Sequence, residues 1–413
     1  MKPAFEIMAP VGSFESLEAA LRAGCHSVYF GIEQLNMRSR SSINFTLEDL
    51  KEISARCQAR NVRTYLTMNT ILYDHDIQLM KSIVNAAQEA DITAIIAADH
   101  AVMAHCRSIG MPLHISTQAN VTNIETVEFY AAFADVMVLS RELSLRQVKD
   151  IARQIEKRQV KGPSGALIRL EVFAHGALCM AVSGKCYLSL HSHNASANRG
   201  ACIQNCRKSY VVTSKEDGTE LEIDNEYIMS AKDLCTIGFI DKIQDAGVSI
   251  LKIEGRGRSA DYVDETVRCY REAAESLQGG SYSAEKIEGW MTRLAKVYNR
   301  GFWDGYYLGR KMGEWNDDYG SKATEKKLFV GRGVKYFKIP QVGEFRMESF
   351  DLKVGDDVMI TGPHLGVIRQ TIDELRVDGE PVDSVKKGDL FSLKVEERIT
   401  PSVKIYKIES ATA

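Results

Sequence analysis

The chain has 413 residues, of which 45% are hydrophobic and 26% charged, and its 52 basic against 55 acidic residues give a formal net charge of −3. This composition excludes a disordered chain and a collagen-like repeat, and any nucleic-acid binding must come from a local basic patch. The N-terminus shows no signal-peptide core and no apolar run reaches 18 residues, so we expect a cytoplasmic protein without a membrane span. In that compartment the nine cysteines are expected to be buried thiols, metal ligands or redox groups rather than disulfides.

Eight short apolar runs recur at intervals that suit alternating strands and helices. Their continuous hydrophobicity is typical of parallel strands covered on both faces. The predicted strands are Phe5–Ala9, Ser27–Gly31, Val62–Met68, Thr93–Ala98, Pro112–Ser116, Val136–Ser140, Ile168–Phe173 and Ile250–Glu254. The predicted intervening helices are Ser16–Ala23, Leu47–Arg60, Asp76–Ala90, Ala101–Ile109, Ile124–Phe133 and Leu145–Lys157. This α/β pattern favours a (β/α)8 TIM-like barrel over a doubly wound open sheet, because no G-x-G-x-x-G follows a strand.

One predicted connection is far longer than the others. Residues 174–249 separate the seventh and eighth strands and contain five of the nine cysteines. Long connections in compact domains usually carry function, and loops that follow barrel strands lie on the catalytic face. We therefore expect a barrel domain over residues 1–298, with a long cysteine-bearing loop at 174–249.

The rest of the chain changes character. Residues 262–277 and 284–298 are predicted to be helices that complete the barrel domain, and residues 299–327 a linker rich in aromatic and basic residues. From 328 to 413, short alternating strands are separated by Gly-Asp turns, and LKVGDDVMITG and VKKGDLFSLKV repeat one K-x-G-D pattern. This last region is predicted to be a small antiparallel β-barrel.

Four cysteines crowd into a glycine-rich part of the long connection. Cys179, Cys186, Cys202 and Cys206 are separated by six, fifteen and three residues. Zinc sites favour a close pair of cysteines on each arm, whereas an iron–sulfur cluster accepts uneven spacing. Three interpretations of these cysteines therefore stay open: they bind an iron–sulfur cluster, they bind a zinc ion, or they are unligated thiols. Cys235 could serve as a spare ligand, and the others are expected in the core: Cys25, Cys57, Cys106 and Cys269.

The run EVFAHGALCMAVSGKCYLS, from Glu171 to Ser189, resembles the signature of the collagenase-like peptidase family U32. Further blocks that resemble this family are MAPVGSFESLEAALRAGCHSVYFG, STQAN, SRELSL, KIEGRGRS and NRGFWDGYYLG, so the resemblance covers nearly the whole chain. The C-terminal region resembles that of the tRNA hydroxylation branch, which forms 5-hydroxyuridine at the wobble position.

The resemblance implies an iron–sulfur enzyme that hydroxylates C5 of a tRNA wobble uridine without molecular oxygen, with prephenate as co-substrate. It implies that Cys179, Cys186, Cys202 and Cys206 hold a [4Fe–4S] cluster. In a quinone-pathway relative a later cysteine replaces the last ligand, so Cys235 is kept in reserve. The expected partners are tRNA and prephenate, with no DNA and no membrane.

Two other functions stay open at this point. The first is a peptidase, as the family name states, although the chain has neither the H-E-x-x-H of zinc proteases nor a G-x-S-x-G nucleophile turn. The second is a non-catalytic, metal-bearing RNA-binding factor, with zinc as the alternative to a cluster.

Charged side chains alternate at the end of the last barrel strand. Lys252, Glu254, Arg256 and Arg258 would all turn toward the barrel interior if the strand persisted. Lys252 and Glu254 are predicted either to form a structural ion pair or to act as catalytic groups. Arg256 and Arg258, together with Arg199 in the long connection, are predicted to bind anions, because guanidinium groups clamp carboxylates in two places. The alternative for Arg256 and Arg258 is a solvated loop without a ligand.

Further candidates follow other strands of the predicted barrel. His175 and Glu171 lie beside the cysteines, where they could relay a proton, and a histidine satisfied by loop carbonyls is the alternative. Gln118, Asn120 and Asn69 follow the fifth and third strands at the same face. Their amides could read the edge of an extruded base or simply cap turns.

A local basic stretch offers a candidate RNA footprint. Residues 293–338 contain eleven basic and five acidic residues, interleaved with Phe302, Trp303, Tyr306, Tyr307 and Trp315. Basic groups for phosphates among aromatic stacking surfaces suit single-stranded RNA. The alternative is a hydrophobic seam between two domains, flanked by solvated charges.

Overall fold

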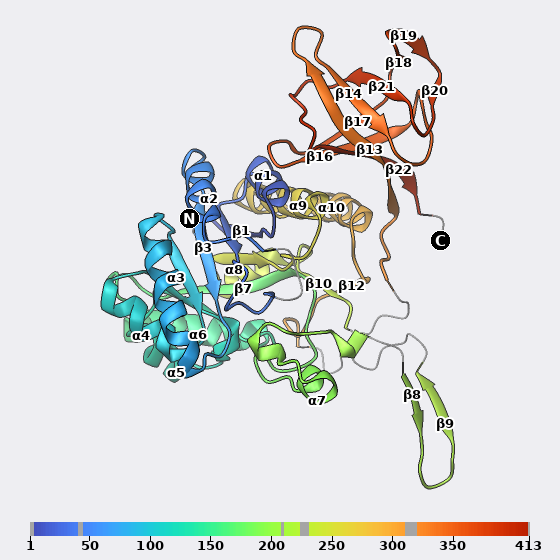
Figure 1. Cartoon of the computed structure of the whole chain (residues 1–413). Coiled ribbons are helices and arrows are strands. Elements are labelled where there is room, and N and C mark those ends of the chain that lie inside the picture. Colours follow the sequence, from blue (N-terminus) through green and yellow to red (C-terminus); the bar gives the residue numbers. More distant parts are fainter. Residues whose placement is uncertain (1–3, 40–43, 208–209, 224–230, 310–319, 412–413) are drawn as a thin grey trace.

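Eight parallel strands close into a barrel in the computed structural model of the chain, which describes residues 4–39, 44–207, 210–223, 231–309 and 320–411 (Figure 1). The strands are β1 (Glu6–Pro10), β2 (Ser27–Phe30), β3 (Arg63–Met68), β4 (Ala94–Ala97), β5 (Leu113–Ile115), β6 (Val136–Val138), β7 (Arg169–Gly176) and β11 (Ile250–Ile253). The barrel closes because β11 pairs with both β1 and β7, so that Ile250 lies opposite Glu6 on one side and Glu171 on the other. The predicted TIM-like fold is confirmed.

Helices follow the strands and cover the outside of the barrel (Figure 1). They are α1 (Phe14–Arg22), α2 (Asp49–Gln58), α3 (Ile77–Glu89), α4 (His100–Ile109), α5 (Ile124–Ala131), α6 (Leu145–Arg158), α8 (Ile240–Asp245), α9 (Ala260–Gln278) and α10 (Ala284–Lys296). Helix α6 shows how local sequence sets these bounds. It begins with a capping box between Ser144 and Gln147, and its apolar stripe of Val148, Ile151 and Ile155 is buried.

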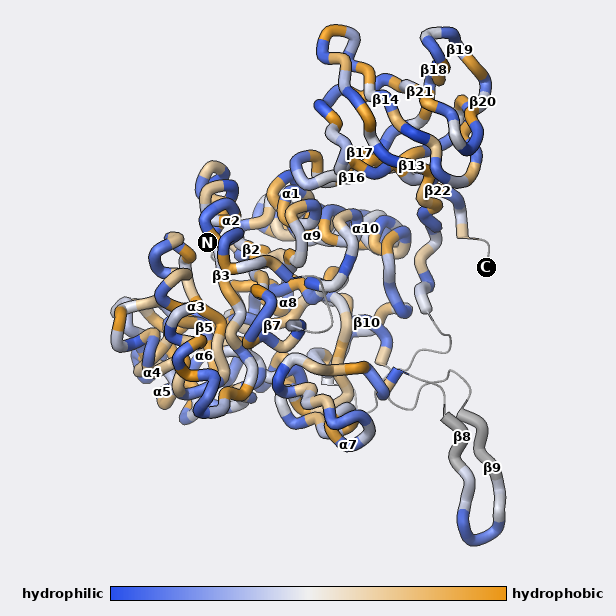
Figure 2. Tube along the Cα trace, in the orientation of Figure 1, coloured by the Kyte–Doolittle hydropathy of each residue, from blue (hydrophilic) through white to orange (hydrophobic). Residues whose placement is uncertain are grey.

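The main core lies between the barrel strands and the helices. A second apolar layer fills the barrel itself, from Met8, Tyr29, Tyr65, Ala94, Ile96, Val136 and Ile250. Polar residues share this interior, because Glu171, Lys252 and His114 are also buried. In Figure 2 hydrophobic colouring runs through both the barrel and the C-terminal region, whereas the tip of the hairpin that projects from the barrel is hydrophilic. No helix in the described part of the chain has both the length and the apolar character needed to cross a membrane.

The connection between β7 and β11 is a folded insertion rather than an open loop. It contains α7 (Leu188–His193), two single turns η3 (Ala197–Arg199) and η4 (Asn205–Arg207), the hairpin β8 (Tyr210–Thr213) and β9 (Glu220–Ile223), and β10 (Asp233–Cys235). Strand β10 runs antiparallel to the end of β7, with Cys235 opposite His175. The predicted linker supplies a further strand, β12 (Phe302–Trp303), which pairs with β10. Both segments are therefore anchored to the barrel.

The C-terminal region is an antiparallel sheet domain with its own core. Its strands are β13 (Glu325–Phe337), β14 (Val342–Met347), β15 (Leu352–Lys353), β16 (Asp357–Gly362), β17 (Gly366–Thr371), β18 (Leu375–Val377), β19 (Glu380–Val382), β20 (Ser384–Val385), β21 (Leu390–Lys394) and β22 (Lys404–Ser410). Eight of them form one sheet in the order β17-β16-β22-β13-β14-β21-β18-β19. The antiparallel, all-β character predicted for this region is confirmed.

The sheet domain packs against α1 and α9 of the barrel (Figure 1). Arg22 of α1 forms an ion pair with Glu397, and Lys327 of β13 lies 2.5 Å from Asp261 of α9. Gly366 fits directly on α1, where an added Cβ would lie 2.8 Å from the backbone nitrogen of Ala19. The two domains are thus joined by charged and close-packed contacts.

Candidate functional site

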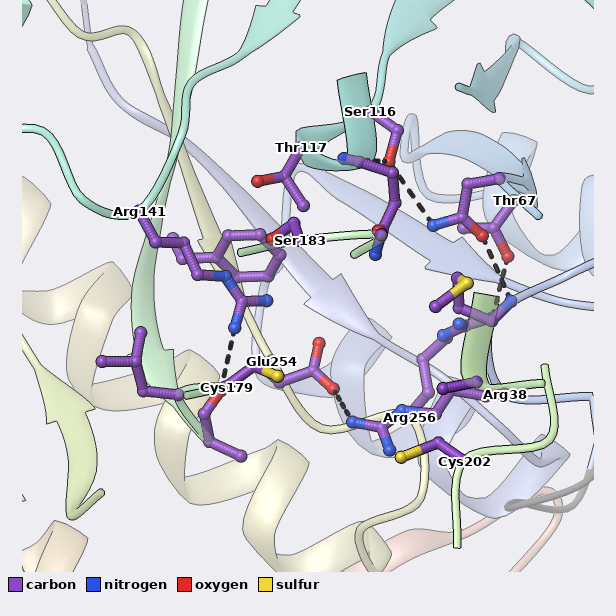
Figure 3. Close-up of a pocket in the computed structure, with 18 of the residues that line it drawn as sticks. Arg38, Thr67, Ser116, Thr117, Arg141, Cys179, Ser183, Cys202, Glu254 and Arg256 are labelled. Atoms are coloured by element: carbon purple, nitrogen blue, oxygen red, sulfur yellow. Dashed lines mark hydrogen bonds and ion pairs between the residues drawn. The ribbon is translucent and has the colours of Figure 1, made fainter. Parts of the chain in front are cut away.

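A cavity of about 280 Å³ opens at the carboxyl ends of the barrel strands. Its walls come from Tyr29 of β2, Thr67 of β3, Ile96 of β4, Val138 of β6, Phe173 of β7 and Lys252 of β11. The loops that follow these strands and residues 177–207, called here the cysteine segment, supply most of the remaining lining (Figure 3). The long connection therefore lies over the face of the barrel on which this fold places its active sites.

All four predicted metal-ligating cysteines, Cys179, Cys186, Cys202 and Cys206, line this cavity. Burial raises the pKa of the Cys206 thiol, and the other three thiols raise it further, while Arg207 lowers it. Four sulfurs around one cavity are the donor set of an iron–sulfur or a zinc site. Among the described residues, however, no three His, Cys, Asp or Glu side chains are already grouped to hold a metal. The donors fit such a group by chemistry and location.

Two glycines let the cysteine segment approach the barrel loops. Gly184 and Gly200 have φ of +72° and +87°. A Cβ on Gly184 would lie 2.7 Å from Oε1 of Gln118, and one on Gly200 would lie 2.5 Å from the backbone oxygen of Asn36. These positions need glycine for both backbone conformation and space.

The remaining cysteines lie away from the cavity. Cys25, Cys57, Cys106 and Cys269 are buried, as predicted. Cys235 is also buried, and its sulfur contacts the Tyr270 hydroxyl at 3.9 Å and the sulfur of Met291 at 3.6 Å. It does not belong to the lining with the other four.

The cavity is strongly basic. One carboxylate, Glu254, faces seven basic side chains in its lining, which are Arg38, Arg141, Arg207, Lys252, Arg256, Arg258 and Arg300. Glu254 forms an ion pair of 2.9 Å with Arg38. Burial raises the pKa of Glu254, but Arg38, Arg141 and Arg256 lower it to about 2 overall. The excess of positive charge favours an anionic ligand.

Arg256 is the most buried arginine of this lining. It is 7% exposed and donates to the neutral oxygens of Asn36, at 3.0 Å, and Thr67, at 2.8 Å. Burial lowers its pKa, while Tyr29 and Glu254 raise it. A buried guanidinium held by neutral groups retains an unmet preference for an anion. Arg258, also in the lining, stacks on the Tyr298 ring, whose centroid lies 3.6 Å from its guanidinium carbon.

The predicted ion pair between Lys252 and Glu254 does not form. Strand β11 ends at Ile253, so the alternation that would align these side chains stops before Glu254. Lys252 instead contacts Glu171, with 2.8 Å between Nζ and Oε1, and Nδ1 of His114 lies 3.4 Å from the other carboxylate oxygen. Glu171 is fully buried behind Lys252, which itself reaches the cavity floor.

The other predicted site residues divide into two groups. Gln118 and Asn69 line the cavity, and Oε1 of Gln118 is buried without a hydrogen-bond partner. Asn120 lies behind the lining and donates to the backbone oxygen of Ser183, which positions the cysteine segment. Arg199 binds Asp76 at 2.7 Å and fastens the same segment to the loop after β3.

His175 is likewise outside the lining. It is 1% exposed, packs against Tyr262, Tyr270 and Phe302, and its Nδ1 lies 3.4 Å from the Tyr270 hydroxyl. Burial and the nearby Arg258 lower the pKa of His175 to about 3, so it is neutral at physiological pH. The side chain of His175, which belongs to β7, is therefore packed among aromatic residues outside the cavity.

Sequence reasoning missed Arg38, Arg141 and His114. The Arg141 guanidinium carbon lies 4.0 Å from the centroid of the Phe173 ring, and its Nε is buried without a hydrogen-bond partner. Arg38 and Arg141 follow β2 and β6, so position after a barrel strand could have identified them. His114 lies inside β5, where a polar residue in a buried strand was the available signal.

The model of peptidase family U32 matches residues 12–317. The chain belongs to this family. A protein named "Collagenase" from Porphyromonas gingivalis (strain W83) is 55% identical over 98% of both chains. "tRNA hydroxylation protein P1" of Bacillus subtilis is 28% identical, over 96% of this chain and 93% of its own. "tRNA hydroxylation protein P" of Escherichia coli K12 is 26% identical, over 94% and 92%. Relatives of this chain thus carry two kinds of name, one for a collagenase and one for tRNA hydroxylation. The residues of the cavity have to distinguish between these two functions.

Proposed function

We propose that the chain is an iron–sulfur enzyme of tRNA modification that hydroxylates C5 of a wobble uridine, with prephenate as co-substrate and without molecular oxygen. The observation that carries this proposal is the lining of one cavity by four cysteines and seven basic side chains. The relatives named tRNA hydroxylation proteins, which align over nearly the whole chain, support the choice of substrate. The proposed place of action is the cytoplasm.

In this proposal Cys179, Cys186, Cys202 and Cys206 hold a [4Fe–4S] cluster, which supplies redox chemistry when bound. The chain's own residues bind and orient the substrates. Arg256 and its neighbouring guanidinium groups bind the two carboxylates of prephenate, because they face only one internal carboxylate.

The polar side chains of the cavity have separate tasks. Lys252 holds a proton at Nζ on the cavity floor, where Glu171 keeps it in place from behind. The unpartnered Oε1 of Gln118 is available to a donor on the base. Phe173 and Tyr29 give the floor its apolar surface and exclude water around Lys252.

A peptidase is the second candidate, because the 55% identical relative is named a collagenase. Thiol proteolysis needs a cysteine hydrogen-bonded to a histidine. No such pair occurs among the hydrogen bonds of the described residues. The geometry therefore favours RNA modification over proteolysis as the function of the cavity.

The test combines metal analysis with nucleoside analysis. Anaerobically purified protein is expected to contain roughly four iron and four sulfide with absorbance near about 400 nm. Both should be lost in Cys202→Ala/Cys206→Ala and kept in Cys57→Ala, which alters a buried core cysteine. Mass spectrometry of tRNA should show that 5-hydroxyuridine disappears on deletion and returns with wild type and Cys57→Ala only.

Two other sets of results would each support one of the alternative functions. A zinc ion without sulfide, or a cluster without any change in 5-hydroxyuridine, would make the protein a metal-bearing RNA-binding factor. Hydrolysis of gelatin by metal-free protein would favour the peptidase.

A further inference from the structure

The basic stretch at 293–338 separates into two groups in the folded chain. The first group is neutralised by carboxylates of the barrel domain and by Glu325 of the sheet domain. It forms the ion pairs Arg293–Glu265, Lys296–Glu325, Arg300–Asp233 and Lys327–Asp261. Trp303 packs with Leu178 and Ala231, and Tyr307 belongs to the main barrel core. These aromatic residues are therefore packed within the barrel domain instead of forming a seam between the two domains, and Trp315 lies outside the described residues.

The second group lies on the sheet domain, where Arg332 forms one row with two cations from outside the stretch, so that three adjacent strands each contribute one. Arg332 of β13 is directly opposite Arg346 of β14 on one side and Lys404 of β22 on the other. Side chains directly opposite each other in a sheet lie about 5 Å apart, and like charges at that distance destabilise it. We call these three residues the cation row.

The cation row lies on the outer face of the sheet. Ile405, which follows Lys404, belongs to the core of the sheet domain, so Lys404 points to the opposite face. Arg332 and Arg346 are exposed and Lys404 is half-buried. The part of the row formed by Arg332 and Arg346 is therefore open to a large ligand, whereas Lys404 lies beside the contact with α1, since its cross-strand partner Thr361 is buried against Glu15.

The acidic residues near the row only partly balance it. Glu348 lies 3.4 Å from Arg332. Glu344, two residues before Arg346, is opposite Lys335, which adds a fourth cation to this face. Among the described residues, neither Arg346 nor Lys404 has an ion pair. Glu15 of α1 also approaches this face, because its Oε1 lies 3.5 Å from the hydroxyl of Thr361, which is opposite Lys404. Four cations then face three carboxylates, and this small positive excess is the complement of a polyanion.

Aromatic side chains continue the same face beside the row. Phe329 and Tyr406 are cross-strand partners with ring centroids 5.7 Å apart, and the Arg332 guanidinium lies 5.8 Å from the Phe329 ring. Tyr406 is two residues from Lys404 in β22, so both point outward. Basic groups beside aromatic rings are typical of surfaces that bind nucleic acid.

The row has a fixed place relative to the cavity. The sheet domain is held on α1 and α9, whereas the cysteine segment lies at the carboxyl ends of the strands, away from these contacts (Figure 1). A single ligand that contacts both the cation row and the cavity must extend well beyond the portion that enters the cavity.

We propose that the cation row, Arg332, Arg346 and Lys404, binds the phosphate backbone of tRNA outside its anticodon stem–loop. This inference rests on the proposed function, in which the wobble base enters the cavity. Guanidinium groups bind phosphate oxygens in pairs. Bound phosphates would also relieve the repulsion among three cations aligned across neighbouring strands.

The experiment measures tRNA binding by fluorescence anisotropy at several salt concentrations, with full-length tRNA and with its isolated anticodon stem–loop. The test variant is Arg332→Ala/Arg346→Ala/Lys404→Ala. The matched control, Arg146→Ala/Arg153→Ala/Lys157→Ala, removes the same charge from exposed positions on α6. A third variant, Arg332→Lys/Arg346→Lys/Lys404→Arg, keeps the charge of the row.

We expect the test variant to bind full-length tRNA roughly 10- to 100-fold more weakly at low salt, with a salt slope reduced by about 2 to 3. Its affinity for the stem–loop should stay at the wild-type value. The α6 control and the charge-keeping variant should bind both RNAs nearly as wild type does. Thermal unfolding checks that all variants fold.

Three results would overturn the inference. They are unchanged binding by the test variant, equal losses in the α6 control, and an equal loss of stem–loop binding. If any of these occurs while deletion still abolishes 5-hydroxyuridine, the docking surface alone is wrong. If deletion leaves 5-hydroxyuridine unchanged, the proposed function fails first, and the docking surface fails with it.

Discussion

Replacing Lys252 by methionine should show how much this lysine stabilises the fully buried carboxylate of Glu171 inside the barrel. Glu171 has no exposed surface, and Nζ of Lys252 lies 2.8 Å from its carboxylate. Burial by itself raises the pKa of Glu171, but Lys252 and His114 lower it to about 2 overall. Methionine preserves much of the length of lysine and removes its charge, so Lys252→Met isolates the electrostatic contribution.

The size and sign of the effect follow from this pKa. Lowering it from the ordinary 4.5 to about 2 corresponds to ~3 kcal/mol of stabilisation at neutral pH. Because the folded-state pKa lies below the unfolded one, this stabilisation is complete above about pH 4.5 and is lost as the pH falls toward 2. In Lys252→Met, burial dominates and raises the pKa of Glu171 above its unfolded value, so folded protein takes up a proton more readily.

We therefore expect Lys252→Met to lower the free energy of unfolding by about 3 to 5 kcal/mol at pH 7, and by less at pH 5. Urea unfolding would be followed by tryptophan fluorescence, to which the buried barrel residues Trp290 and Trp303 contribute. The double variant Glu171→Gln/Lys252→Met should recover part of the loss, since no carboxylate is left unpaired. An equal loss at both pH values, or a double variant weaker than the single one, would refute the argument.

Three further predictions concern the anion site, the cysteine segment and the domain contact. Arg256→Gln should weaken prephenate binding by roughly 10- to 100-fold in calorimetry, through loss of a buried charged donor; an unchanged Kd would contradict it. Arg199→Ala, which removes the 2.7 Å contact to Asp76, should speed hydrogen exchange in the cysteine segment and cost at most about 1 kcal/mol; equal exchange in both proteins would count against it. Gly366→Val, at φ +63° against α1, should lower the melting temperature more than Gly379→Val, at φ +88° with open space. Equal effects would mean that the contact with α1 contributes nothing.

The barrel was predictable because each of its strands is buried on both faces. Buried faces produce continuous apolar runs such as Ile95 and Ile96 in β4, which stand out from the amphipathic helices. Strands β10 and β12 were not predictable, since three residues and two residues are too few to show a period. They are strands because β10 pairs with the end of β7 and β12 pairs with β10, which is a tertiary effect.

The candidate site was only partly predictable, for a related reason. The cysteines could be identified by type and spacing, and all four reach the cavity. The alternation of side chains along a strand predicted that Glu254 and Lys252 lie on the same face. Strand β11 ends at Ile253, between them, and Glu254 pairs with Arg38 whereas Lys252 pairs with Glu171. Arg38 belongs to a loop whose fold no local pattern specifies, so its pairing with Glu254 appears only in three dimensions.

The charges and the thiols of the cavity are complementary. Lys252 and Arg300 have carboxylate partners outside the lining, Glu171 and Asp233, whereas the five other guanidinium groups share one lining carboxylate, Glu254, and repel one another in a partly buried site. Thiolates are the form in which cysteines bind metals, and nearby cations stabilise them. Four thiolates would offset much of the positive excess, and a bound dicarboxylate would offset more. Each of these groups lowers the positive potential that attracts the other, so an occupied metal centre is expected to weaken, not strengthen, the binding of an anionic substrate.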